Sequence, residues 1–115
     1  MYMSMKTYSF GLLAEYIIAL FYLIRFYKIL GHRVKTRMGE IDLIALRGRT
    51  IVFLEVKARM KEIDEILCTI HQQKRIRNAA TLFLQRNSKY NGYDIRFDLC
   101  IIRPYRWPQI IENSW

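Results

Sequence analysis

The chain has 115 residues, of which 52% are hydrophobic and 25% charged, with five glycines and two prolines. This size and composition favour one globular domain and exclude a collagen-like, low-complexity or intrinsically disordered chain. Nineteen lysines and arginines against ten acidic residues give a net charge of +9, which favours a polyanionic partner, either nucleic acid or an acidic membrane surface.

The first predicted element is a helix over residues 9–30, because apolar residues recur there at three- and four-residue spacing and Gly31 follows as a natural stop. Glu15 and Arg25 interrupt the apolar run. Its longest uninterrupted part, residues 16–24, is far shorter than the ~20 residues that span a bilayer. We therefore expect a buried helix and no membrane attachment. The predicted buried stripe consists of Leu13, Ile17, Leu20, Ile24 and Tyr27.

Three strands are predicted next, over residues 32–38, 40–46 and 50–58, from their β-branched and apolar content. The connections between them are short and contain glycine, which favours antiparallel hairpins. The third strand is apolar on both faces, as expected of a central strand that is covered on both sides.

The second half of the chain predicts a crossover from this third strand to a fourth. A helical connection of that length lets the two strands lie parallel in one sheet. The expected fold is one α/β domain over residues 1–115, in which a mixed four-stranded sheet is flanked by helices. Arg96 and Asp98 alternate onto one face of the fourth strand and are predicted to form a structural pair. The elements are a loop over 59–65, a helix over 66–86, a turn over 88–92, a strand over 95–102 and an irregular tail over 103–115.

Cys68 and Cys100 are far apart in the sequence and show no CxxC or Cys/His spacing. That pattern indicates neither a disulfide framework nor a zinc site, and predicts buried free thiols in a reducing compartment. We accordingly expect a cytoplasmic protein.

Two carboxylates interrupt the apolar strands. Asp42 and Glu55 each stand between two apolar neighbours in the middle of a predicted strand. A carboxylate in such a place must be paired, protonated or bound to a cation, and two of them in adjacent strands reduce stability, which is the usual sign of a site. The two-residue period of a strand places Lys57 on the same face as Glu55, with the backbone carbonyl of Val56 between them.

Oxygen ligands from Asp42, Glu55 and the Val56 carbonyl suit Mg²⁺ (or Mn²⁺), which keeps several waters and shares its other positions with a phosphate. Such an ion polarises the phosphate and activates a water for attack. Lys57 would orient that water or neutralise charge on the phosphate oxygens. On residue types and spacing alone, a buried salt bridge among Asp42, Glu55 and Lys57 is an equal alternative.

Five segments of the sequence together resemble the YraN-like family of small bacterial proteins. They are GEIDLIA at 39–45, FLEVKAR at 53–59, AEYIIALFYL at 14–23, RFD at 96–98 and IIENSW at 110–115. That family is similar to archaeal Holliday-junction resolvases and other PD-(D/E)XK nucleases, whose restriction-endonuclease-like core has the αβββαβ order predicted above. The resemblance implies a metal-dependent endonuclease that hydrolyses phosphodiester bonds in DNA, with branched or structured DNA as candidate substrates. The alternative is a noncatalytic nucleic-acid-binding protein on the same fold.

Carried over residue by residue, the resemblance makes Asp42 the motif aspartate, Glu55 the (D/E) residue and Lys57 the motif lysine. Glu15 matches the first-helix glutamate of the family, which approaches the metal directly or through water. A carboxylate paired with a nearby lysine or arginine is the alternative for Glu15. No proline precedes Asp42, and Ala14 stands where the family usually has glycine, a change that affects how Glu15 is presented.

Nucleic acid, DNA rather than RNA, is the expected partner. On the second predicted helix, Gln73 and Lys74 either face the site or are solvated. Four arginines are candidates for phosphate contacts, which would make binding strongly salt-dependent, and a solvated surface charge is the alternative for each. These arginines are Arg75, Arg77, Arg47 and Arg49.

Four aromatic residues either stack on unpaired bases or anchor the core and the tail. They are Tyr90, Tyr93, Tyr105 and Trp107. The apolar first helix is a candidate interface for a homodimer, unless a single chain buries it alone.

Overall fold

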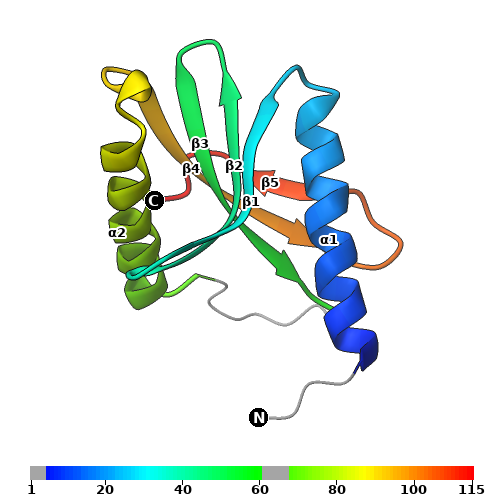
Figure 1. The fold of residues 1–115 in the computed structure, drawn as a ribbon. Coiled ribbons are helices and arrows are strands. Elements are labelled where there is room, and N and C mark those ends of the chain that lie inside the picture. The colour runs from blue at the N-terminus through cyan, green and yellow to red at the C-terminus, as the bar shows by residue number, and fades with distance from the viewer. Residues whose placement is uncertain (1–4, 61–67) are drawn as a thin grey trace.

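A mixed five-stranded sheet with a helix on each face forms the protein in the computed structural model, which describes residues 5–60 and 68–115 (Figure 1). The predicted α/β order of helix, three strands, helix and strand is confirmed. The elements are α1 (Met5–Leu23), β1 (Lys28–Thr36), β2 (Gly39–Arg47), β3 (Thr50–Ala58), α2 (Ile70–Arg86), a 3₁₀ turn (Ser88–Tyr90), β4 (Asp94–Ile102) and β5 (Gln109–Ile111).

The strands lie in chain order across the sheet. β1, β2 and β3 form an antiparallel meander, and α2 then carries the chain to β4, which pairs parallel with β3 from Thr50↔Asp94 to Ala58↔Ile102. β5 pairs antiparallel with β4 inside the segment predicted to be an irregular tail. That prediction was wrong at these residues, because a three-residue strand is too short to show a two-residue period.

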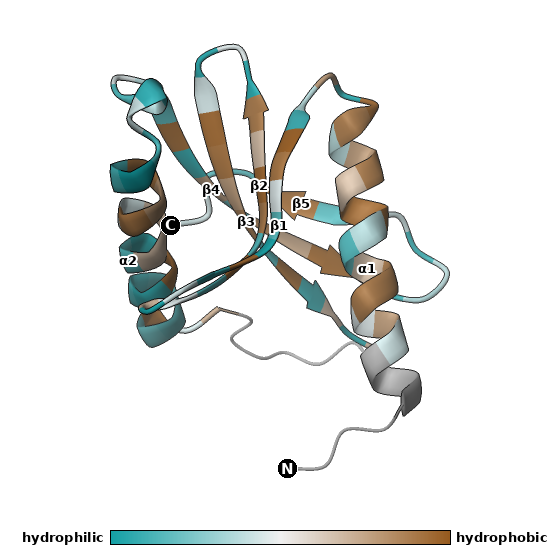
Figure 2. Cartoon of the chain, viewed as in Figure 1, coloured by the Kyte–Doolittle hydropathy of each residue, from teal (hydrophilic) through white to brown (hydrophobic). Residues whose placement is uncertain are grey.

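Each face of the sheet has its own apolar core. The strand residues of β3 alternate between them, with Ile51 and Phe53 facing α2 and Val52 and Leu54 facing α1. All four are buried, which confirms the prediction of a central strand covered on both sides. Figure 2 shows the apolar residues concentrated along the strands between the two helices.

α1 is shorter at its C-terminal end than predicted. It ends at Leu23, and the chain then turns: the N–H of Phe26 donates to the Leu23 carbonyl and the N–H of Tyr27 to the Tyr22 carbonyl, each at 3.0 Å. This double closure is a Schellman motif, with Phe26 in the left-handed region at φ 69° and the rings of Tyr22 and Tyr27 in contact at 4.9 Å. Because a phenylalanine stands where glycine is usual, no residue before Gly31 signalled the end of the helix, and Gly31 instead lies in β1.

The buried face of α1 also differs from the predicted stripe. Leu13, Leu20 and Ile24 are exposed. The helix is apolar on nearly every side, so periodicity alone had no polar face from which to choose the buried one. Among residues 9–23, the buried ones are Ala14, Glu15, Ile18 and Tyr22.

α2 begins with a capping box. The Thr69 hydroxyl accepts from the N–H of Gln72, and the Gln72 side chain accepts from the N–H of Thr69, each at 3.1 Å. Cys68 therefore precedes the helix, while the rest of the predicted start at 66 and most of the predicted loop over 59–65 lie outside the described residues. Cys68 and Cys100 are free and buried, as predicted. Within residues 5–60 and 68–115, no helix combines the length and apolarity needed to cross a membrane.

Candidate active site

The candidate site lies where β2 and β3 separate. The two strands pair from Leu43↔Leu54 to Arg47↔Thr50, yet both continue past Leu43 and Leu54 in the other direction. Beyond that point the β1–β2 hairpin bends toward α2, while β3 continues beside β4 (Figure 1). Asp42 and Glu55 are the first residues past the last pair, so one carboxylate stands on each arm of this fork.

The fork brings together the three residues of the predicted motif. Asp42 Oδ2 accepts a hydrogen bond of 2.8 Å from the N–H of Val56, and the Asp42 carboxyl is also hydrogen-bonded to Glu55. Lys57 Nζ lies 3.5 Å from Glu55 Oε1, and both side chains are largely buried. All three line a cavity of about 200 Å³, whose other lining residues are Gly39, Glu40, Gln72, Arg75 and Ile76.

The electrostatics of the fork keep a proton on Asp42. Burial raises the pKa of Asp42 to about 8, and the nearby charge of Glu55 and the hydrogen bond to it add to this effect, while the N–H of Val56 opposes it. At neutral pH the Asp42 carboxyl therefore keeps its proton. A cation that entered the cavity would displace this proton, so its binding would be linked to pH.

The donor set fits a hard divalent cation. Among residues 5–60 and 68–115, no group of three or more histidine, cysteine, aspartate and glutamate side chains is placed to hold a metal ion. Asp42 and Glu55 would supply two carboxylates, leaving further positions to water, to substrate oxygens and to the Val56 carbonyl, whose role as a ligand stays a prediction. That ligand pattern suits Mg²⁺ better than Zn²⁺ or Ca²⁺, which are usually held by more protein ligands.

Glu15 approaches from the other side of the sheet. It is buried on α1 and pairs with Arg33, whose Nε lies 2.9 Å from Glu15 Oε1. It does not line the cavity, but its charge is close enough to contribute to the raised pKa of Asp42. The structure thus shows the predicted alternative, a carboxylate paired with arginine, and leaves the approach of Glu15 to a metal as a prediction.

His32 is a further candidate residue of the site, and the sequence alone did not identify it. Its Nε2 lies 2.7 Å from Glu15 Oε1, and its ring packs on Tyr16 at 5.4 Å between centroids. In the sheet it is the partner of Leu43, next to Asp42. The residues that His32 contacts come from α1 and β2, which are distant in the sequence. The residues next to it in the sequence therefore show no metal-ligand spacing.

On α2 the cavity is lined by Gln72 and Arg75, not by Gln73 or Lys74. Gln73 Nε2 donates to the Cys68 carbonyl at 3.1 Å, and Lys74 is exposed. The signal was present in the sequence: Gln72 lies three residues before Arg75 and four before Ile76, the buried residue that marks the sheet-facing side of the helix, so Gln72 neighbours both.

Three of the predicted phosphate-binding arginines stack on aromatic rings away from the fork. Arg47 lies 4.4 Å over Tyr27, and Arg49 lies 4.5 Å over Tyr93. Both are near the β2–β3 turn, at the opposite end of β2 from Asp42. Arg77 points away from the cavity and lies 5.1 Å over Phe97.

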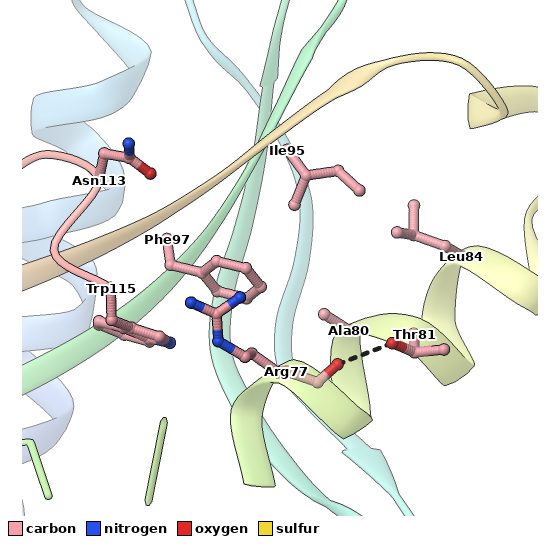
Figure 3. Close-up of a pocket in the computed structure, with 8 residues that line it drawn as sticks. All are labelled: Arg77, Ala80, Thr81, Leu84, Ile95, Phe97, Asn113 and Trp115. Atoms are coloured by element: carbon pink, nitrogen blue, oxygen red, sulfur yellow. Dashed lines mark hydrogen bonds between the residues drawn. The ribbon is translucent and has the colours of Figure 1, made fainter. Parts of the chain in front are cut away.

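Arg77 lines a second hollow, of about 470 Å³, between α2, β4 and the C-terminal segment (Figure 3). Its guanidinium lies above the Phe97 ring, and Trp115 stacks on the same ring at 5.5 Å between centroids. None of the described residues that line this hollow is acidic, and its other lining residues are Ala80, Thr81, Leu84, Ile95 and Asn113.

Comparisons with known proteins agree along nearly the whole chain. The sequence profile of the uncharacterised protein family UPF0102 matches residues 14–102, which include the fork. A UPF0102 protein from Mesorhizobium japonicum is 40% identical over 111 residues, covering 96% of this chain and 89% of that protein. UPF0102 proteins from Chelativorans sp. (41% identical; 96% and 90% covered) and Rhizobium meliloti (37%; 97% and 93%) are similarly close.

Proposed function

The chain belongs to the uncharacterised protein family UPF0102, which confirms the YraN-like resemblance, and we propose that it is a metal-dependent nuclease that hydrolyses phosphodiester bonds in DNA. Branched or otherwise structured DNA is the preferred substrate class. One observation carries the proposal: Asp42 and Glu55 face each other in a cavity that also contains Lys57 and Arg75.

The raised pKa of Asp42 argues against a purely structural salt bridge. In an ion-pair cluster that serves stability, a cation holds the pKa of its carboxylate below the usual range. Here burial and two acidic neighbours raise the pKa of Asp42 instead, although Lys57 lies close to Glu55. The cations of the cavity therefore do not offset the burial and the negative charge around Asp42, and a divalent cation would do so.

The residues of the cavity would each have a separate role in hydrolysis. Asp42 and Glu55 would hold Mg²⁺ or Mn²⁺, which polarises a phosphate and lowers the pKa of a bound water. Lys57 would place its ammonium beside the phosphate and stabilise charge that develops on the oxygens. Arg75, at the wall opposite the strands, is suited to bind a phosphate through two parallel N–H donors.

The first test is a cleavage assay on branched, single-stranded and duplex DNA, with and without Mg²⁺ or Mn²⁺. We expect cleavage that needs the metal and falls by at least about 100-fold in Asp42→Ala, because a ligand and its charge are lost. Asp94→Ala is the matched control, since Asp94 is exposed at the start of β4 and should leave cleavage unchanged.

Cleavage that survives Asp42→Ala, or no cleavage under any condition, would refute the nuclease proposal. Tight, salt-dependent DNA binding without uptake of a divalent metal in calorimetry would instead support the noncatalytic binding protein. The proposed homodimer is a separate question, for which sedimentation gives the mass. The exposed residues Leu13, Tyr16, Leu20 and Leu23 on α1 are its candidate contact surface.

Lys57→Ala should separate chemistry from metal binding. We expect the cleavage rate to fall about 100- to 1000-fold, because a charge aimed at the transition state is lost. The calorimetric affinity for Mn²⁺ should be unchanged or tighter, since a cation next to Glu55 has been removed. Lys28→Ala, at an exposed lysine at the start of β1, is the control. Loss of metal affinity in parallel with activity would contradict the role given to Lys57.

A further inference from the structure

The connection between β4 and β5 exposes two large aromatic side chains. Tyr105 is fully exposed and Trp107 is 88% exposed, whereas Tyr90 and Tyr93 pack against the core that α2 covers. The predicted alternative of anchoring is therefore confirmed for Tyr90 and Tyr93 and wrong for Tyr105 and Trp107. A single exposed ring is common, but two large aromatic rings exposed two residues apart in one segment form a candidate binding surface.

The backbone of this connection is restrained. Residues 103–108 read Arg-Pro-Tyr-Arg-Trp-Pro, so a proline with fixed φ stands on each side of the exposed segment. Tyr105 has φ 62°, a left-handed conformation that is unfavourable for a bulky residue by about 1 to 3 kcal/mol. Such a conformation persists only where the surroundings impose it, so the fold specifies the backbone from which the Tyr105 ring projects into solvent.

The connection begins at the end of the sheet where β3, the strand that carries Glu55, also ends. β3 and β4 are parallel and in register, with Glu55 beside Leu99 and Ala58 beside Ile102, and the N–H of Arg59 donates to the Ile102 carbonyl at 2.9 Å. Figure 1 shows the two arrowheads together, with the connection continuing beyond β4. Three strand residues separate Glu55 from that end, about 10 Å.

The chemistry of the segment fits unpaired bases. Arg103 and Arg106 alternate with Tyr105 and Trp107, and the whole chain carries a net charge of +9. A base that is not stacked in a duplex has a free face, and stacking on an aromatic side chain contributes about 1 to 3 kcal/mol per base. The arginines would follow the phosphates of the same strand.

We propose that residues 103–108 form a stacking platform for unpaired bases of a DNA strand whose phosphodiester reaches the fork at Asp42 and Glu55. This inference rests on the proposed function and makes its substrate class more specific: the strand has unpaired bases within a few nucleotides of the cut. Tyr105 and Trp107 provide the stacking surfaces, and fully paired duplex would use neither.

The test measures binding in EDTA, so that it does not depend on cleavage. In a Trp115→Phe background Trp107 is the only tryptophan, because the chain has two. We expect a single-stranded oligonucleotide to quench its fluorescence to saturation, and blunt duplex to do so weakly. In polarisation assays with labelled single strands, Trp107→Ala and Tyr105→Ala should each weaken binding about 5- to 100-fold, and Trp107→Phe should restore most of it.

Phe26→Ala is the matched control, because Phe26 is also 88% exposed but lies in the turn after α1. Its oligonucleotide affinity should equal that of the wild type. Equal quenching by duplex, or unchanged affinity in both alanine variants, would overturn the platform. So would a blue shift of Trp107 emission on vesicles of phosphatidylcholine and phosphatidylglycerol without a response to oligonucleotides, or a change in sedimenting mass alone.

The same variants distinguish this inference from the nuclease proposal. Metal-dependent cleavage with no effect of Tyr105→Ala or Trp107→Ala on binding would refute the platform and leave the nuclease intact. Stacking of single strands without any cleavage would support the platform on a noncatalytic binding protein. Thermal unfolding checks that the variants fold, as expected for side chains that make little contact with the core.

Discussion

Asp42→Asn should make the metal-free protein more stable at pH 8, by several kcal/mol. An unfolded aspartate loses its proton near pH 4, whereas in the folded protein burial and Glu55 raise the pKa of Asp42 to about 8. Asparagine avoids the burial of this charge, and its side chain can still accept from the N–H of Val56 and donate to Glu55.

The pH dependence has a definite sign. Between pH 4 and pH 8 the folded wild type holds a proton on Asp42 that the unfolded chain has released, so its stability falls as the pH rises through this window. Above the folded pKa the loss is complete. The advantage of Asp42→Asn should therefore be small at pH 4, grow up to pH 8 and stay constant above it.

Urea unfolding from pH 4.5 to 8.5 measures this difference, with Asp94→Asn as the exposed control. Magnesium should add stability to the wild type and little to Asp42→Asn, because only the wild type has the full ligand pair. If Asp42→Asn were less stable than the wild type at pH 8, Asp42 would be a structural ion-pair partner and the metal site would be wrong.

The second large effect is expected at Asp98, which stabilises the other side of the sheet. Asp98 is 0% exposed and accepts from Arg96 Nε at 2.9 Å, from Arg96 Nη2 at 3.0 Å, from the Tyr22 hydroxyl at 2.6 Å and from the N–H of Asn113 at 3.0 Å. Burial raises the pKa of Tyr22 above its usual range, so its hydroxyl remains a donor. One carboxylate thus joins α1, β4 and the C-terminal segment.

We expect Asp98→Ala to lower the free energy of unfolding by about 3 to 5 kcal/mol, because it leaves the Arg96 charge largely buried without its partner. Urea unfolding at pH 7 measures the loss. Glu112→Ala is the control: its side chain is 59% exposed and lies 3.7 Å from Arg96, so that removing it should cost less than about 1 kcal/mol. A similar loss in both variants would contradict the central role given to Asp98.

The sequence was informative where a residue and its strand neighbours determine the outcome. The two-residue period placed Glu55 and Lys57 on one face, and the apolar runs marked β3 as a central strand. The structural pair of Arg96 and Asp98 was likewise predicted and is confirmed. The family resemblance supplied the restriction-endonuclease-like fold, with which the structure is compatible.

The sequence did not predict contacts between elements that are distant in the chain. It also did not predict the helix end at which a residue other than glycine takes the left-handed conformation. Nothing near His32 indicates its contact with Glu15, which depends on how α1 crosses β1. The turn at Phe26 was missed because its left-handed residue is not glycine. Gln72 and Arg75 could have been identified, but only after Ile76 is recognised as the residue of α2 that faces the sheet.

If the fork between β2 and β3 holds a metal ion as proposed, its geometry would determine ion selectivity. Asp42 and Glu55 belong to separate arms, so the main-chain angle at which the β1–β2 hairpin leaves the sheet sets the gap between their oxygens. That hairpin meets α2 at Gly39, where an added Cβ would lie 3.7 Å from the Cβ of Arg75. In the proposed metal site, the ionic radius that the fork accepts would thus be set by how closely a hairpin and a helix pack, and a larger residue at 39 would alter which cation fits.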